Sequence, residues 1–120
     1  MVLVDTSVWV DHLRSGDARL QEALYAGNVI THPFVIGELA CGNLRQRLKV
    51  LRLLESLPIA TVATHKDALT LLDAHRLYGK GLGYIDVHLL SSARLGHDKL
   101  WTRDKSLQSA ASSLKILFKE

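Results

Sequence analysis

Short runs of apolar, often β-branched residues alternate along this sequence with longer stretches whose apolar residues recur every three or four positions. The short runs predict strands, and the longer stretches predict helices that bury one face. Strands are expected at 2–4, 29–31, 59–62, 99–102 and 114–118. Because strands separated by helices pair in parallel through crossover connections, this order predicts a mostly parallel sheet with helices on both faces, a three-layer α/β/α fold.

The helices are expected near 8–13, 20–25, 33–40, 44–57, 65–75, 84–95 and 105–112. Pro33 suits the first turn of its helix, because the N–H that proline lacks has no helical partner there. The residues after it are mostly apolar, which predicts that most of this helix is buried. The helix at 44–57 has apolar residues on one face and basic residues on the other. The glycines of 79–83 predict a loop.

The length and composition of the chain favour one globular domain spanning 1–120, with 48% hydrophobic and 22% charged residues. No segment is apolar for long enough to cross a membrane, and the first residues lack the pattern of a signal peptide. A cytoplasmic protein is therefore expected. The formal net charge of +3 permits a polyanionic partner but does not require one.

Two acidic residues directly follow predicted strands. Asp5 comes after the first strand and Asp104 after the strand at 99–102. Open α/β sheets place their ligand sites at the carboxyl ends of the strands, which favours a functional role. The alternative is that each residue caps the helix that follows it. For Asp5 the two interpretations are evenly balanced, and for Asp104 taken alone the cap is favoured.

Two further acids lie within apolar helices. Glu38 is in the helix expected to be mostly buried, and Asp86 shares an apolar helix face with Leu89 and Leu90. Buried carboxylates are costly unless something compensates their charge. For Asp86 the alternative to a functional role is a buried pair with Arg94 or His88.

Together, the four acids predict a site for a hard divalent cation, because such an ion relieves the repulsion between clustered carboxylates. Magnesium or manganese is the expected metal. No cysteine or histidine pattern with zinc-ligand spacing accompanies the acids. A metal of this kind activates water and neutralises charge on a leaving oxygen, which is chemistry suited to phosphodiester hydrolysis.

Four stretches of the sequence resemble the motifs of one family. They are Val-Leu-Val-Asp-Thr-Ser at 2–7, Gly-Glu-Leu-Ala-Cys-Gly at 37–42, Gly-Tyr-Ile-Asp at 83–86 and Thr-Arg-Asp at 102–104. Their order and surroundings resemble PIN domains of the VapC toxin class over essentially the whole chain. The resemblance implies a PIN fold and a magnesium- or manganese-dependent endoribonuclease, the toxin of a type II toxin–antitoxin system.

The resemblance also implies roles for individual residues and partners. The four acids would be the catalytic residues, with Asp5 and Asp86 as the principal metal ligands. Thr6, Ser7 and Thr102 would support them. The implied partners are an RNA substrate, a VapB-type antitoxin and a second copy of the chain in a homodimer.

Among the basic residues, Lys80 and Arg103 are the ones most expected to hold RNA phosphates, and exposed solubilising charge is favoured for most of the others.

A phosphatase using Asp5 as nucleophile fits less well, because the expected second Asp is replaced by Ser7. A dinucleotide-binding domain lacks its glycine fingerprint. A PIN nuclease that is not a toxin, and a PIN-like module that binds RNA or protein without cutting, stay open as alternatives.

Overall fold

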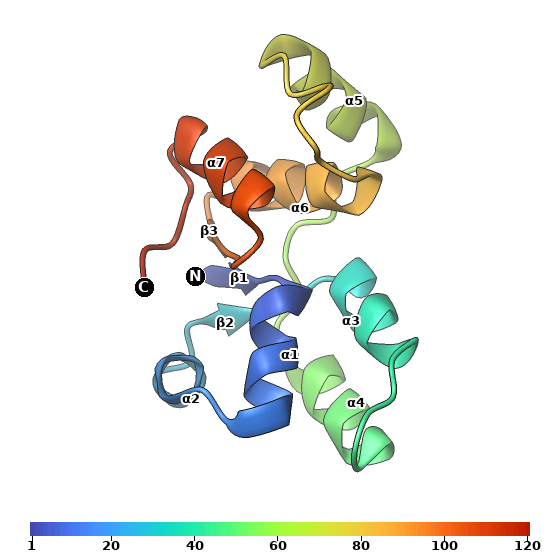
Figure 1. The fold of residues 1–120 in the computed structure, drawn as a ribbon, viewed down its shortest axis with the longest axis vertical. Helices are drawn as coiled ribbons and strands as arrows, with labels where there is room; N and C mark the ends of the chain where they lie inside the picture. Colours follow the sequence, from blue (N-terminus) through green and yellow to red (C-terminus); the bar gives the residue numbers. More distant parts are fainter.

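A computed structural model of residues 1–120 has a parallel sheet at its centre (Figure 1). The strands are β1 (Val2–Val4), β2 (Val29–Ile30) and β3 (Lys99–Trp101), in the order β2-β1-β3. Leu3 of β1 lies opposite Ile30 of β2 and Leu100 of β3. All three side chains are buried, as expected for a sheet that is covered on both faces.

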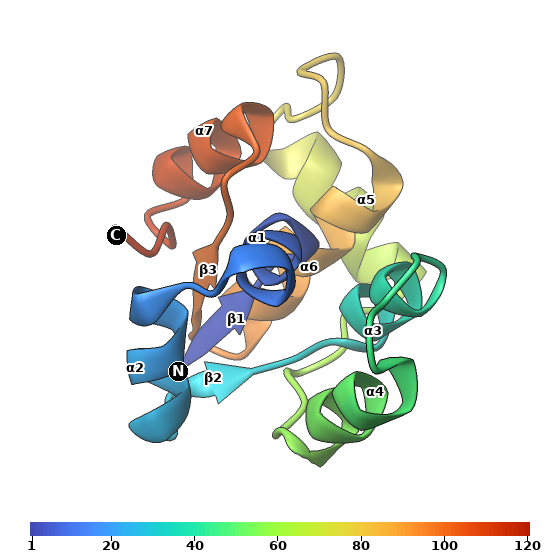
Figure 2. The same ribbon diagram turned by 60° about the horizontal axis from the view of Figure 1, so that its bottom comes forward.

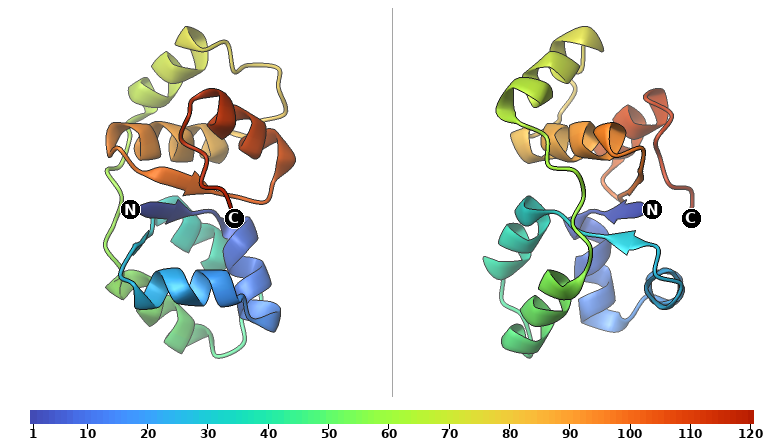
Figure 3. Two further views of the ribbon diagram at one scale, coloured as in Figure 1. Left: turned by 90° about the vertical axis from the view of Figure 1, so that its left-hand side faces the viewer. Right: turned by 180° about the vertical axis from the view of Figure 1, so that it is seen from behind.

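Helices cover both faces of this sheet (Figures 1 and 3). On one side lie α1 (Thr6–Ser15), α2 (Ala18–Tyr25), α3 (Pro33–Ala40) and α4 (Arg47–Ser56). On the other side lie α5 (His65–Ala74), α6 (Tyr84–Leu95) and α7 (Lys105–Ser113). The predicted three-layer α/β/α fold is therefore confirmed. None of these helices is long and apolar enough to cross a membrane.

The core lies between the sheet and its helices and includes two fully buried tryptophans. Trp9 projects from α1, and Trp101 is the last residue of β3. Trp101 also packs against Phe118 near the end of the chain, with the ring centroids 4.7 Å apart. Burying such large side chains supplies a major part of the hydrophobic stabilisation.

The two predicted outer strands at 59–62 and 114–118 do not form as regular strands. Each makes one isolated parallel bridge, Thr31 with Ile59 and Leu100 with Leu117. At the first edge the chain pairs only around Thr31 and then turns towards α5, leaving Ile59 and Val62 about half exposed. The prediction of a whole strand at each edge is therefore wrong.

Most helix boundaries agree with the sequence pattern. Thr64 begins α5 with a capping box, in which its hydroxyl accepts from the N–H of Asp67 and the Asp67 side chain accepts from the N–H of Thr64. The start of α4 differs, because Arg47 is its first residue rather than Leu44. Gln46 adopts a left-handed backbone conformation with φ of 52°, which interrupts the helix at that point.

The strand order determines where a site can form. The chain passes from β1 to β2 across one face, whereas the connection into β3 runs through helices on the other face (Figure 2). The carboxyl ends of β1 and β3 therefore lie side by side at the point where the connections diverge. This is the position at which open α/β sheets bind their ligands.

Candidate active site

Asp5 leaves the end of β1 and is held in place by both neighbouring segments. Its Oδ2 atom accepts hydrogen bonds from the hydroxyls of Ser7 at 2.7 Å and Thr102 at 2.8 Å. The same oxygen accepts the N–H of Ser7 and so caps α1. With only 6% of its surface exposed, Asp5 is a buried acid whose position depends on these donors. The cap and the candidate site therefore use the same residue.

The loop after β3 places Asp104 beside this arrangement. The N–H of Asp104 donates to Thr102 Oγ1 at 3.1 Å, and Asp104 Oδ1 caps α7 by accepting from the N–H of Leu107 at 2.9 Å. Ser7 Oγ accepts from the N–H of Arg103 in the same loop at 3.0 Å. The predicted supporting residues Ser7 and Thr102 thus join the ends of β1 and β3.

Asp86 approaches from the first turn of α6 and is half-buried. Burial raises the pKa of its carboxyl, the hydrogen bond from the N–H of Gly83 opposes this, and the negative charges of the three acids named below raise the pKa further. These acids are Asp5, Asp104 and Glu38. Repulsion between charges is screened beyond about 10 Å, so each of these three acids lies near Asp86.

No basic partner neutralises Asp86. The alternative of a buried pair with Arg94 or His88 is wrong, because none of the ion pairs in the structure includes Asp86. Arg94 instead contacts His75, which directly follows α5, and both ring nitrogens of His88 lack a hydrogen-bond partner. Sequence reasoning assigned no role to Gly83, although a glycine three residues before an acid at a helix start is a recognisable capping pattern.

Glu38 reaches the site from α3, and Thr6 Oγ1 donates to its Oε1 atom at 2.7 Å. The expectation that α3 is mostly buried is wrong, since Val35 and Leu39 are its only buried residues and Glu38 is exposed. A helix that packs one stripe against its neighbours leaves the opposite face in solvent, even when that face carries few polar residues. Glu38 therefore incurs no burial cost.

The four carboxylates share one feature. Each has one oxygen that accepts hydrogen bonds within the protein and one that accepts none, and no carboxylate is in an ion pair. No three His, Cys, Asp or Glu side chains are placed so that one metal ion could contact all of them. The arrangement thus offers oriented, unpaired oxygens, of which at most two could bind one ion directly.

The two predicted RNA-binding residues differ in their surroundings. Lys80 is exposed and lines a shallow hollow beside Lys105 of α7. Arg103 is bound by three carboxylates, donating to Asp11 and Glu120 at 2.7 Å and also to Asp17. These contacts argue against the expected role of Arg103 in holding RNA phosphates, because its charge is already matched within the protein.

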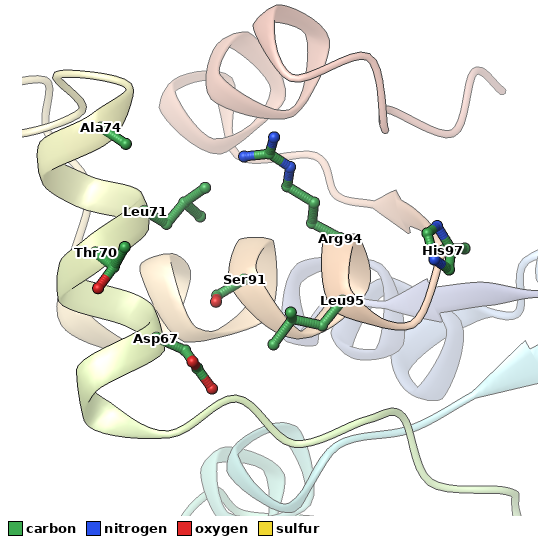
Figure 4. Close-up of a pocket in the computed structure, with 8 residues that line it drawn as sticks. All are labelled: Asp67, Thr70, Leu71, Ala74, Ser91, Arg94, Leu95 and His97. Carbon is green, nitrogen blue, oxygen red and sulfur yellow. The ribbon is translucent and has the colours of Figure 1, made fainter.

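A cavity of about 360 Å³ lies between α5 and α6 (Figure 4). Figure 4 shows Leu71 of α5 together with Ser91 and Leu95 of α6 around this space. The α6 residues that line the cavity lie in the second half of that helix, whereas Asp86 is in its first turn. Since none of the four acids lines it, this cavity is separate from the candidate active site.

Residues 2–112 match the sequence model of the PIN domain family. The chain belongs to the PIN-domain family. The matched region contains all four acids and every element that positions them. The four sequence motifs resemble the same family.

Two curated relatives of this PIN domain place it in the VapC group. Both are named Ribonuclease VapC32, from the CDC 1551 / Oshkosh and H37Rv strains of Mycobacterium tuberculosis. Each is 48% identical to the chain over 121 residues, which covers all of this chain and 98% of the relative. Among solved structures, FitAcB from Neisseria gonorrhoeae superposes with a TM-score of 0.64 over 93% of this chain and 94% of that one, at 18% identity. That likeness supports the fold.

Proposed function

We propose that this PIN domain is a magnesium-dependent endoribonuclease that hydrolyses RNA phosphodiester bonds, and that it is the toxin of a type II toxin–antitoxin system. The observation that carries the proposal is the convergence of four carboxylates that no cation of the protein neutralises. Relatives that match the full chain at 48% identity are named ribonucleases. Unpaired acids at a switch point of the sheet fit a metal-assisted hydrolase.

The donor set fits magnesium. Mg²⁺ prefers oxygen ligands, binds through one or two carboxylates and keeps several waters. Asp5 and Asp86 are the proposed ligands, each with one oxygen free of hydrogen bonds. The raised pKa of Asp86 supports this assignment, because a cation beside repelling carboxylates would favour the charged form. Manganese would substitute through the same ligands.

The residues of the chain have separable roles in this proposal. Ser7 and Thr102 fix the Asp5 carboxylate, and the N–H of Gly83 fixes that of Asp86. The bound metal would lower the pKa of a water molecule and offset charge on the leaving oxygen. Glu38 is exposed and has one oxygen free to accept a proton from an attacking water.

A cleavage assay with matched variants tests the enzymatic part. The wild-type chain should cut RNA with magnesium and stop when the metal is chelated, and Asp5→Asn should lose activity by at least a hundredfold. Asp73→Asn is the matched control, because Asp73 is an exposed acid of α5 remote from the site. RNA binding without cleavage in every condition would refute the proposal and identify a binding module instead.

The toxin assignment is tested separately in cells. Expression of the wild-type chain should arrest growth, Asp5→Asn should relieve the arrest, and a VapB-type antitoxin encoded beside the gene should bind the chain and block cleavage. RNA cleavage without growth arrest would indicate a PIN nuclease that is not a toxin. The mass of the purified protein in solution tests the proposed homodimer.

A further inference from the structure

An open groove of about 400 Å³ adjoins the candidate active site between α1, α3 and the start of the α3–α4 connection. Its lining includes Thr6 and Glu38, which belong to the four-carboxylate site, and also Arg14 and Arg45. One hollow is therefore shared by catalytic candidates and by two cations. The backbone of an RNA strand bound at the acids would continue along this groove.

A second hollow begins one residue further along the chain. Gln46, Lys49 and Arg52 contribute to its lining, whereas Arg45 lines the first groove. Lys49 and Arg52 are spaced at i and i+3 on α4, which places them on one face of that helix, and Arg45 lies just before the helix begins. We call these three residues the basic row. It extends from the groove beside Glu38 onto α4.

The charges of the basic row are not matched within the protein. All three side chains are exposed, and none of the ion pairs of the structure includes them. No acid occurs in the segment 39–54. Arg103, by contrast, is neutralised by three carboxylates. Arg47 is excluded from the row because it donates to the carbonyl of Ala40 at 2.8 Å and so joins α3 to α4.

We propose that the basic row binds the backbone phosphates of a single RNA strand next to the cleaved bond. This inference rests on the proposed function, since it extends the substrate beyond the four-carboxylate site. The acids repel a polyanion wherever no metal screens them, so substrate affinity must come from cations nearby. A row of unmatched cations that tracks a groove is the usual means of holding a strand regardless of its sequence.

A binding experiment tests the row directly. The probe is a single-stranded RNA of twenty nucleotides, and the protein carries Asp5→Asn so that it does not cut. Replacing all three residues of the row by Gln should weaken binding by about tenfold or more in moderate salt. The slope of log affinity against log salt should fall in magnitude by about 2, since each phosphate contact on a single strand contributes about 0.7.

The matched control removes the same number of positive charges elsewhere, through Lys66→Gln, Lys115→Gln and Lys119→Gln. Lys66 belongs to α5, which lies on the opposite side of the molecule from α4 (Figure 1). Lys115 and Lys119 lie near the C-terminus, beyond α7. The control should keep the wild-type salt slope. Equal slopes for wild type and the row variant, or an equal loss in the control, would overturn the inference and leave the groove to a protein partner.

Cleavage kinetics without the Asp5→Asn change separate this inference from the proposed function. On long RNA the row variant should raise KM by about tenfold with little change in kcat, whereas on a dinucleotide, whose only phosphate is the one at the cleaved bond, KM should rise far less. An equal loss on both substrates would also overturn the inference. If the wild-type chain cuts no RNA at all, the proposed function fails, whereas the salt slopes still decide whether the row binds RNA.

Discussion

Thr102 Oγ1 donates a hydrogen bond of 2.8 Å to Asp5 Oδ2, joining two residues 97 positions apart in the sequence. Both residues are buried, and each directly follows a strand of the same parallel pair. The Asp5 carboxylate is therefore oriented by the neighbouring strand and not only by its own helix. This contact makes the geometry of the candidate site depend on the pairing of β1 with β3.

Thr102→Val tests that dependence. The substitution keeps the shape of the side chain but removes a donor to Asp5 and an acceptor for the N–H of Asp104. We expect the free energy of unfolding to fall by about 1–3 kcal/mol, because buried polar groups lose their partner. RNA cleavage should fall by about tenfold or more, as the Asp5 carboxylate is less well oriented. Thr102→Ser keeps the hydroxyl and should stay close to wild type; if Ser and Val variants are equally impaired, the hydroxyl is not the cause.

Asp86→Asn should stabilise the protein at neutral pH. The folded-state pKa of Asp86 is raised by burial and by the other acids, so its ionised form is disfavoured by folding. The gain should be present at neutral pH and should disappear as the pH falls below the ordinary pKa of an aspartate, where both states are protonated. Thermal unfolding across this range measures it. Magnesium should raise the Tm of wild type but not of the variant, and a variant less stable than wild type at neutral pH would contradict this account.

Arg103→Met should destabilise the protein without changing how RNA binding depends on salt. Arg103 neutralises Asp11, Asp17 and Glu120, and all four side chains are partly exposed, so we expect a loss of about 1–2 kcal/mol at low salt. Arg103 lowers the pKa of both Asp17 and Glu120, so this contribution should fade as the pH falls through their folded pKa values. Arg14→Met, which breaks a more exposed pair, is the control. A shallower salt slope for RNA binding would restore Arg103 as a phosphate-binding residue.

We expect His32 to make the stability of the protein sensitive to mild acid. Its ring is fully buried, and burial followed by the charge of His88 lowers its pKa from 6.5 to about 4. Because the unfolded chain binds a proton below pH 6.5 and the folded chain does not, stability should fall by roughly 3 kcal/mol between pH 6.5 and 4. His32→Asn keeps a capping side chain for α3 but cannot titrate. Its unfolding free energy should depend less on pH in this window, and an unchanged slope would contradict the assignment.

Several features of the fold could be predicted because they depend on local pattern. The apolar run at 2–4 predicts the buried strand before Asp5. Helical apolar spacing followed by Gly96 predicts the helix Tyr84–Leu95. The outer strands at 59–62 and 114–118 were predicted wrongly, since an apolar run does not reveal whether a neighbouring strand continues beside it. Pairing at a sheet edge is decided by the path of the rest of the chain.

The roles predicted for the four acids stay predictions, and one reason for expecting a role for Glu38 is wrong. Glu38 was singled out because its helix looked buried, and it is exposed. Its sequence motif, Gly-Glu-Leu-Ala, was the sounder indication. The sequence also cannot reveal that three distant carboxylates surround Arg103, which argues against its predicted role in holding RNA phosphates.

The sequence by itself determined the order of strands and helices, the identity of the acids and the family motifs, because these follow from local spacing and residue chemistry. Only the tertiary structure decided which oxygen of each acid is held and which is free, and which cations lack partners. Hydrogen bonds such as Thr102 to Asp5 and ion pairs such as Arg103 to Glu120 join residues far apart in the chain. Their formation depends on packing in three dimensions, which fixes distances of a few ångströms that no linear pattern records.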